Sequence, residues 1–261
     1  MDKLNLKLLP LSSVLPIEGK DPERVIRLSK SIAEEGVLRN PLLVSYNKNI
    51  DKFILLDGTN RFTSLLDSGA TAVPVQVIDY DNPLIKLKSW HHYLENIDRL
   101  LEILLNSFNF NRLNIDETKQ PLSELNYSLG LIHDNSFYYL DSNEKDLLMI
   151  TSCFELYDGL FSYTRIADGN FLRLEDSSHL KIVYKSFDKS ELVQFSESNI
   201  KTPAGITRHI FDVRVLNLNI DIGLLFSKIP FVHKETLFDE RVSKALKNYR
   251  FYEESTLVCF D

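Results

Sequence analysis

A carboxylate, a glycine and an arginine follow a short apolar run in the segment Ile54-Leu55-Leu56-Asp57-Gly58-Thr59-Asn60-Arg61. Such a run is typical of a buried strand, and Gly58 allows a tight turn that a ligand can approach closely. If a helix follows, its first N–H groups are unpaired and attract an anion. Asp57 could then hold a metal ion, and Arg61 could bind a phosphate through two hydrogen bonds. An ordinary strand-turn-helix with a solvated arginine explains the pattern equally well, because Asp-Gly turns are common.

The motifs of several large enzyme classes are absent from the sequence. There is no Gly-x-x-x-x-Gly-Lys-Ser/Thr phosphate loop, and no His-Arg-Asp and Asp-Phe-Gly pair of a protein kinase. Neither Gly-x-Ser-x-Gly nor Gly-x-Gly-x-x-Gly occurs in a suitable context. The six histidines show no His-Glu-x-x-His spacing, so a zinc protease site is also excluded.

The composition is that of a globular protein with a sizeable core. The 261 residues are 44% hydrophobic and 11% aromatic, enough for one large domain or two smaller ones. A net charge of -7 and a pI near 5.5 disfavour broad nucleic-acid binding. Two cysteines, Cys153 and Cys259, cannot form a disulfide framework or a four-thiolate metal site, which indicates a reducing compartment.

Neither a secretory signal nor a membrane span is expected. The segment Met1–Pro10 contains two lysines and no long apolar run. No window of the sequence approaches the ~18–20 apolar residues that a membrane-spanning helix needs. We therefore expect a cytoplasmic protein without membrane contacts.

Periodicity predicts a compact mixed α/β unit over the first eighty residues, with strands at 4–11, 41–44, 53–56 and 73–78 and helices at 22–35 and 61–68. Trp90-His91-His92 is then expected to open an amphipathic helix whose apolar stripe is Tyr93, Ile97, Leu100, Leu101 and Leu104.

The remainder of the chain is expected to be irregular over 111–131. Beyond that, the pattern predicts strands at 137–140, 182–184, 213–218 and 257–260 and helices at 146–157, 222–225 and 238–252. The class is therefore α+β, with an N-terminal α/β module at residues 1–90 and a mixed α/β domain with a helical end at 91–261. No repeat or low-complexity linker marks the boundary near residue 90.

Residues 18–80 resemble the ParB/sulfiredoxin-like superfamily. The resemblance rests on Asp21-Pro22-Glu23-Arg24, on residues 36–44, on Leu56-Asp57-Gly58-Thr59-Asn60-Arg61, and on residues 69–75. Within it, the chain is most similar to the free L-serine kinases, which make O-phospho-L-serine from a nucleotide and free serine. That narrower resemblance covers most of residues 1–225 and rests on residues 89–92, 163–169 and 216–218 and on Thr202-Pro203-Ala204-Gly205-Ile206-Thr207-Arg208.

The resemblance implies an enzyme that transfers a phosphoryl group from ATP or ADP to the serine hydroxyl with the help of Mg²⁺. Residues 1–90 would then bind the nucleotide, with Gly58, Thr59, Asn60 and Arg61 at its phosphates and Asp57 as the ligand to Mg²⁺. Glu18, in the loop before the first helix, lies where the family has its general base. Without the resemblance, Glu18 would be interpreted as a solvated loop acid, because glutamate is mostly exposed.

Residues 91–261 would supply most of the serine site. Arg208, after a glycine turn, is suited to a bidentate bond with the substrate carboxylate, and Thr207 could add a hydroxyl. Trp90 with His91 or His92 would form the wall and the polar tip of the pocket; the family position of the histidine, two residues after the tryptophan, favours His92. Arg165 is a further candidate, with a structural salt bridge as the alternative.

The sequence departs from the serine kinase pattern at Asn60, where such kinases usually have a histidine before the motif arginine. Asparagine can bond to a phosphate but supplies neither a positive charge nor a proton. The chain also lacks the nucleophilic cysteine of sulfiredoxins and the Gly-Glu-Arg-Arg form of CTP-binding ParB proteins. The alternative function is a nucleotide- or haem-sensing, DNA-associated regulator on the same scaffold. Some relatives make phosphoserine for siderophore biosynthesis, and a homodimer is compatible with the sequence.

Overall fold

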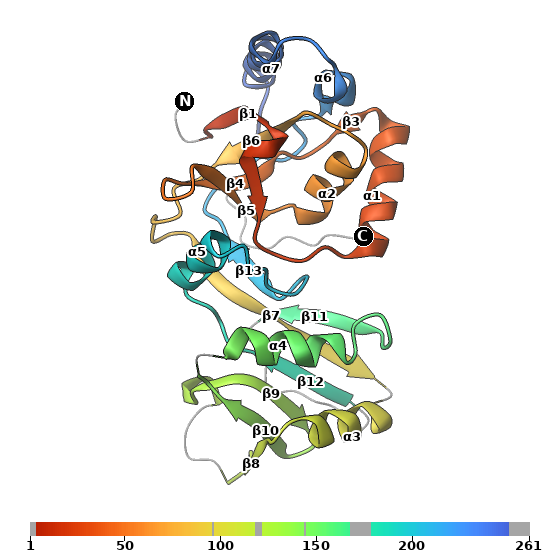
Figure 1. Ribbon diagram of the computed structural model, residues 1–261, viewed down its shortest axis with the longest axis vertical. Coiled ribbons are helices and arrows are strands. Elements are labelled where there is room, and N and C mark those ends of the chain that lie inside the picture. Colours follow the sequence, from red (N-terminus) through yellow and green to blue (C-terminus); the bar gives the residue numbers. More distant parts are fainter. Residues whose placement is uncertain (1–3, 96, 118–121, 144, 168–178, 251–261) are drawn as a thin grey trace.

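The structure is a computed structural model that describes residues 4–95, 97–117, 122–143, 145–167 and 179–250. Figure 1 shows two lobes stacked along the long axis of the molecule. One lobe contains a five-stranded sheet with helices α1 (Pro22–Glu35) and α2 (Thr59–Asp67); the other contains a larger sheet with α3 (Asp98–Ser107) and α4 (Asp146–Glu155). The predicted α+β class is confirmed.

The five-stranded sheet has the order β1-β6-β4-β5-β2 and mixes parallel with antiparallel pairs. Its strands are β1 (Leu6–Pro10), β2 (Val14–Pro16), β4 (Leu42–Asn47), β5 (Lys52–Asp57) and β6 (Ala72–Val77), with a short 3-10 helix at Leu11–Ser13. The central strands are buried on both faces, as their continuous apolar runs require. Because β5 ends at Asp57, the sheet delivers this carboxylate to the start of α2.

The start of α1 is fixed by its own cap and by α2. Asp21 Oδ1 accepts the Arg24 N–H at 3.0 Å, and Pro22 occupies the first helical position. The Asp21 N–H also donates to Asn60 Oδ1 at 2.9 Å. The loop that carries Glu18 is therefore tied to the first turn of α2.

The larger sheet has the order β11-β7-β12-β9-β10-β8, and β13 pairs with the first half of β7. Its strands are β7 (Lys86–Glu95), β8 (Asn111–Asn114), β9 (Tyr127–His133), β10 (Ser136–Asp141), β11 (Tyr163–Ala167), β12 (His179–Tyr184) and β13 (Thr207–Ile210). A 3-10 turn at Leu122–Glu124 and helix α5 (Lys189–Glu197) complete this part. Strand β7 is long enough to reach from one lobe to the other (Figure 1).

The chain returns to the first lobe after β13. Strand β14 (Ile220–Asp221) pairs with β3 (Val37–Leu38), and helices α6 (Ile222–Phe226) and α7 (Phe231–Ala245) follow. This segment contributes four buried residues to the core of the five-stranded sheet: Leu218, Ile220, Leu225 and Phe238. The first core is thus closed by residues more than a hundred positions after its last strand, and the expected boundary at residue 90 lies within β7.

Several local expectations are wrong. Trp90-His91-His92 lies in β7 and not at a helix start, because this segment is paired with a neighbouring strand on each side; α3 begins only at Asp98. Residues 111–131 are not irregular throughout, since they include β8 and the start of β9. The last described helix covers Phe231–Ala245 in place of 238–252, and the strand expected at 257–260 lies outside the described residues.

Residues 213–218 alternate like a strand but pair with no strand of the described residues. The side chain of Gln76 takes that place: its Nε2 donates to the Val213 carbonyl at 3.2 Å and its Oε1 accepts the Val215 N–H at 2.9 Å. Further on, the Asn217 N–H donates to Asn40 Oδ1 at 2.8 Å. Side-chain amides thus satisfy backbone groups that would otherwise require a neighbouring strand.

Candidate active site

The turn between β5 and α2 is shaped for an anion. Gly58 has a φ of 106°, and a Cβ there would lie 2.6 Å from Leu42 Cδ2, so only glycine fits without strain. No side chain of the described residues caps this end of α2. The N–H groups of the first turn, which include those of Thr59 and Asn60, therefore face outward with the positive end of the helix dipole.

Two arginines converge on one oxygen of Asp57. Arg61 Nη2 and Arg214 Nη2 each donate to Asp57 Oδ2 at 2.6 Å. Arg61 is anchored further, because its Nη1 donates to the Asn40 and Pro41 carbonyls at 2.9 and 3.1 Å. Burial lowers the pKa of Arg61, and the neighbouring charge of Arg214 adds to that effect while Asp57 opposes it. The cluster carries one more positive than negative charge at the helix start.

Glu18 is held by the segment that contains the Pro-Ala-Gly turn. Its Oε1 accepts the Gly205 N–H at 2.9 Å, the Thr207 N–H at 3.2 Å and the Thr207 hydroxyl at 3.0 Å. The two backbones are also joined directly, because the Gly19 N–H donates to the Thr202 carbonyl at 2.8 Å and the Thr202 N–H donates to the Ile17 carbonyl at 3.0 Å. We call this arrangement the Glu18 cradle.

The pKa of Glu18 is raised to about 7, although its side chain keeps some open surface. Burial is the main cause; the bonds from Thr207, the charge of Arg165 and the bond from Gly205 each lower the pKa and offset part of the effect. Because the three bonds all fall on Oε1, the second carboxylate oxygen is left to act as a proton acceptor. A carboxylate with a pKa near neutrality is suited to general base catalysis.

Arg165 and Arg208 border the cradle. Arg165, from β11, packs against Gly205 so closely that a Cβ on the glycine would lie 2.3 Å from the guanidinium carbon. The buried Nε of Arg165 has no hydrogen-bond partner among the described residues. Arg208 lies over the Trp90 ring, with its guanidinium carbon 4.8 Å from the ring centroid. Trp90 is held in turn by its backbone N–H, which donates to the Ile206 carbonyl at 2.8 Å.

The two histidines of β7 point to opposite faces of the sheet. His91 Nδ1 accepts the Tyr184 N–H at 3.2 Å, so its ring supports the strand pairing. His92 is fully buried, stacks on Tyr163 with 4.1 Å between ring centroids, and has its Nδ1 2.5 Å from the Tyr157 hydroxyl. Burial, followed by the charge of Arg165, lowers the pKa of His92 to about 3, so the ring is neutral.

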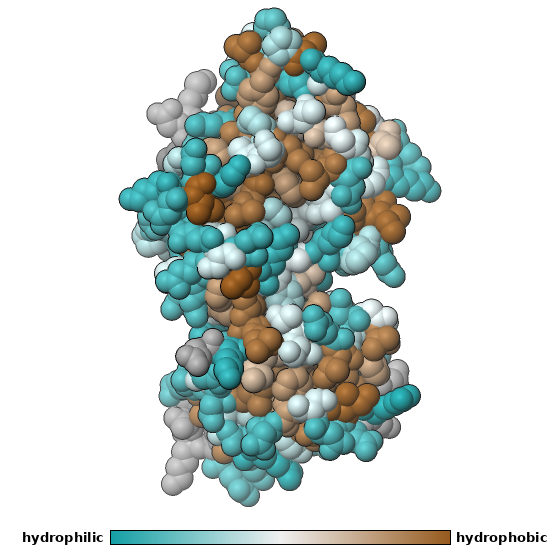
Figure 2. All heavy atoms as spheres, viewed as in Figure 1, coloured by the Kyte–Doolittle hydropathy of each residue, from teal (hydrophilic) through white to brown (hydrophobic). Residues whose placement is uncertain are grey.

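Strand β13 joins the two halves of the site. It starts at Thr207, beside Glu18, and His209 two residues later bonds to the Tyr80 hydroxyl at 2.8 Å. Burial lowers the pKa of His209 to about 4, opposed by the nearby charge of Asp57. These elements lie where the two lobes meet, at the level where the surface narrows (Figures 1 and 2).

The structure therefore brings the predicted residues into two adjoining groups. Asp57, Gly58, Thr59 and Arg61 lie at the start of α2, while Glu18, Trp90, His92, Arg165, Thr207 and Arg208 surround the Glu18 cradle. Asn60 turns its amide oxygen to the Asp21 N–H, and His91 faces the opposite side of β7. Arg214 was missed, because it lies in residues 213–218, whose alternation indicates a strand, and nothing in its spacing points to Asp57.

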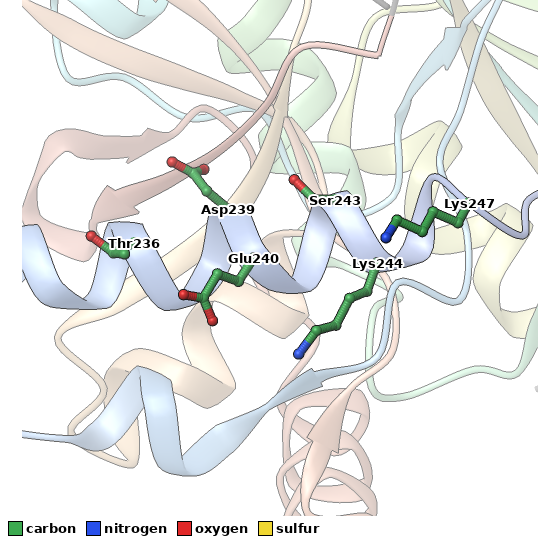
Figure 3. Close-up of a pocket in the computed structure, with 6 residues that line it drawn as sticks. All are labelled: Thr236, Asp239, Glu240, Ser243, Lys244 and Lys247. Carbon is green, nitrogen blue, oxygen red and sulfur yellow. The ribbon is translucent and has the colours of Figure 1, made fainter.

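A hollow lies away from this site, on the surface of α7. Figure 3 shows the described residues that line it, which come from α7 and from the turn that follows it: Thr236, Asp239, Glu240, Ser243, Lys244 and Lys247. It is an open groove of about 470 Å³ with acids and lysines interspersed. Nothing in it converges on a point, so it does not compete with the site at the lobe junction.

Comparison with known proteins identifies relatives by sequence and by fold. No protein-family model matches the chain. The chain is 26% identical over 230 residues to the ATP-dependent L-serine kinase SbnI of Staphylococcus aureus, a match that covers 85% of this chain and 84% of that protein. It is 34% identical over 96 residues to an ATP-dependent L-serine kinase of Staphylothermus marinus, but this match spans only 38% of that protein's length and 36% of this chain.

Solved structures show the same fold. SbnI with a C-terminal truncation from Staphylococcus aureus superposes with a TM-score of 0.81 at 23% identity, covering 94% of this chain and all of that one. A free serine kinase in complex with AMP has a TM-score of 0.71 at 17% identity, over 87% of this chain and 95% of that one. The chain thus has the fold of the free serine kinases. By sequence it is a homologue of proteins named ATP-dependent L-serine kinase, and the resemblance inferred from the motifs is confirmed.

Replacing Gly205 with alanine tests whether the turn is built around Arg165. Gly205 has a φ of +71° and its added Cβ would clash with the guanidinium, whereas Gly159 has a φ of +74° and open space around it. We expect Gly159→Ala to lower the free energy of unfolding by about 1–2 kcal/mol through its backbone alone. Gly205→Ala should lose roughly 1–3 kcal/mol more. Equal losses in urea denaturation would contradict a tight fit between Gly205 and Arg165.

Proposed function

We propose that this protein is a free L-serine kinase that transfers a phosphoryl group from an adenine nucleotide to the serine hydroxyl, forming O-phospho-L-serine. The observation that carries the proposal is the Glu18 cradle, which holds a carboxylate with a pKa near 7 next to an anion-binding helix start. The names of the homologues, ATP-dependent L-serine kinase, support both the acceptor and the donor. ATP is the donor that we propose.

Glu18 acts as the general base. Its Oε1 is occupied by the three bonds of the cradle, so its other oxygen takes the proton of the serine hydroxyl. As that proton leaves, the serine oxygen forms a bond to the γ-phosphorus, and the bond from phosphorus to the bridging oxygen of the nucleotide breaks. Proton transfer of this kind contributes about 10²–10⁴-fold to the rate.

The start of α2 binds the phosphates. Its free N–H groups and Arg61 provide fixed donors, since Arg61 is anchored to two carbonyls. Arg214 is more exposed than Arg61, with 32% of its side chain accessible against 14%, so it has more freedom to move from Asp57 to a phosphate oxygen. We propose Arg214 as a phosphate ligand beside Gly58, Thr59, Asn60 and Arg61.

The carboxylate of Asp57 is suited to bind Mg²⁺. Mg²⁺ bound to nucleotides takes one or two carboxylates and completes its shell with phosphate oxygens and waters. The Oδ2 of Asp57 accepts both guanidinium bonds, and no described residue bonds to its Oδ1. Among the described residues, no group of three or more His, Cys, Asp or Glu side chains surrounds it. When bound there, Mg²⁺ would neutralise charge on the phosphates during transfer.

The serine site lies around Trp90, with Arg208 over its ring and Arg165 at Gly205. Both guanidinium groups are suited to the substrate carboxylate. Thr207 acts through Glu18, because its hydroxyl already donates to that carboxylate. We assign the polar tip of the pocket to His92, since the ring of His91 bonds to the backbone of β12.

The direct test is phosphoserine formation. The protein is incubated with L-serine, Mg²⁺ and either ATP or ADP, and the product is detected by ³¹P NMR or mass spectrometry. We expect product with ATP. Glu18→Gln should lower kcat by at least ~100-fold, because the amide cannot accept the proton. The control Glu23→Gln changes an exposed glutamate on α1 and should leave the rate unchanged. Absence of product with both nucleotides would rule out the proposed activity.

The raised pKa of Glu18 predicts a specific pH profile. Because the base must be ionised, kcat/KM for serine should rise with pH and level off above about 7. At pH 6 the rate should be roughly tenfold below its plateau. The nucleotide also titrates in this range, so the residual rate of Glu18→Gln provides the control and should lack the inflection. An identical inflection in both proteins would assign it to the nucleotide.

The raised pKa of Glu18 also makes the free energy of unfolding depend on pH. A carboxyl whose folded pKa is raised stabilises the fold below its unfolded pKa of 4.5, and this contribution is lost as pH rises through about 7. Glu18→Gln should therefore gain stability relative to the wild type between pH 5 and pH 8.

Arg214→Ala tests the missed phosphate ligand. Loss of a charge-assisted bond should raise the KM for the nucleotide by roughly tenfold or more, while the KM for serine should change less than about twofold. Arg39→Ala removes an arginine of the same lobe whose partner is the exposed Glu35, and it serves as the control. A rise in the KM for serine alone would remove Arg214 from the nucleotide site.

A further inference from the structure

Three buried side chains form a hydrogen-bonded chain behind the serine site. The hydroxyl of Tyr157, just after α4, lies 2.5 Å from His92 Nδ1 and bonds to the hydroxyl of Tyr184 at the end of β12. Tyr184 lies 3.4 Å from the same ring nitrogen. All three side chains are at most 1% exposed. Three elements, α4, β7 and β12, thus meet at one polar point in an apolar core.

The hydrogens shared by Tyr184, Tyr157 and His92 can be counted. Burial raises the pKa of both tyrosines well above the ordinary value, so each keeps its proton, and His92 is neutral with a single N–H. If Tyr184 donates to Tyr157, Tyr157 can donate to His92 Nδ1. In the opposite direction, His92 Nδ1–H would donate to Tyr157 and Tyr157 would donate to Tyr184. The atom next to the Tyr184 O–H, His92 Nδ1 at 3.4 Å, would then carry a hydrogen and could not accept, which would leave the Tyr184 O–H without an acceptor among the described residues. A buried donor without an acceptor is unfavourable, so the first direction is favoured.

The other ring nitrogen, Nε2, is left for the ring hydrogen. His92 Nε2 is buried and has no hydrogen-bond partner among the residues that the structure describes. Burial is the main influence on the pKa of His92, and an interaction with the Gly205 backbone opposes it, so the ring lies close to Gly205 in the Glu18 cradle. Because Nδ1 accepts from Tyr157, the single ring hydrogen is on Nε2.

His92 Nε2 and the unpartnered Nε of Arg165 both lie beside Gly205. Two buried donors without acceptors stand next to Gly205, whose N–H holds Glu18. Buried donors normally have acceptors, so a pair without one is matched to an acceptor that arrives with a ligand. Carboxylate oxygens suit a guanidinium and a neutral N–H together. If the ring hydrogen were on Nδ1, Nε2 would present a lone pair and repel such an oxygen.

We propose that Tyr157 and Tyr184 are positioning residues that hold His92 as a neutral Nε2–H donor toward the carboxylate of the amino-acid substrate. This inference rests on the proposed serine kinase function for the identity of the ligand, but not for the state of the ring. Tyr157 sets the tautomer directly. Tyr184 supports this tautomer because it donates its own hydrogen to the Tyr157 oxygen. The hydrogen of Tyr157 is then directed to His92.

The state of the ring is tested by long-range ¹H–¹⁵N correlation NMR on the protein labelled with ¹⁵N-histidine. The His92 signals are assigned by their loss in His92→Asn. We expect the Nε2–H pattern in the wild type, unchanged between pH 6 and pH 8, and a loss of that single pattern in Tyr157→Phe. An Nδ1–H pattern in the wild type would overturn the proposal. This readout does not need turnover, so it separates the inference from the proposed activity.

The consequence is tested by kinetics. Tyr157→Phe should raise the KM for serine about tenfold with the KM for the nucleotide changed less than about twofold, and Tyr184→Phe should have the same effect in smaller measure. Tyr138→Phe, at a tyrosine packed against the same core, is the control and should change neither. Equal effects on both substrates, or none in either variant, would show that the tyrosines only support the fold. If Tyr157→Phe does not fold, Tyr184→Phe and the wild-type spectrum decide.

Discussion

The bonds that join Glu18 to the Gly205–Thr207 turn are the constraint on which the site depends. They connect residues 187 and 189 positions apart and position the carboxylate, the turn and the start of β13 together. The same turn presses on Arg165, and its Ile206 carbonyl holds the backbone of Trp90. The proposed base and the residues proposed to hold its substrate are thus placed by one short segment. A small displacement of that segment would misplace all of them at once.

The electrostatics divide the site into two different environments. Around Asp57, two guanidinium groups and a helix start create an excess of positive charge at a partly open surface. Around Glu18 and His92, burial dominates, and it moves the pKa of the acid up and that of the histidine down. Strong charge would therefore face the phosphates of the proposed nucleotide, while the groups proposed to handle a proton or donate a neutral hydrogen bond lie in a region of low dielectric.

Much of this was predictable from the sequence, and the rest was not for identifiable reasons. The strand that ends at Asp57 and the turn at Gly58 follow from local apolar runs and turn chemistry, and the α+β class follows from the alternation of such runs. Trp90-His91-His92 is predicted to open a helix because an amphipathic stripe follows it directly, whereas its strand pairing comes from the distant residues of β11 and β12. Arg214 and Tyr157 are invisible to local patterns, since their partners Asp57 and His92 lie 157 and 65 positions away.

The return of the chain to the first core sets an order on biosynthesis. The five-stranded sheet has emerged after about eighty residues, yet its apolar face is covered only when Leu218, Leu225 and Phe238 arrive. At translation rates of about 5–20 residues per second, this interval lasts roughly 7–32 s. During that time the nascent sheet exposes apolar side chains on the ribosome. The lobe that is synthesised first is thus the lobe whose core is completed last. Chaperones can bind its exposed apolar face during this interval.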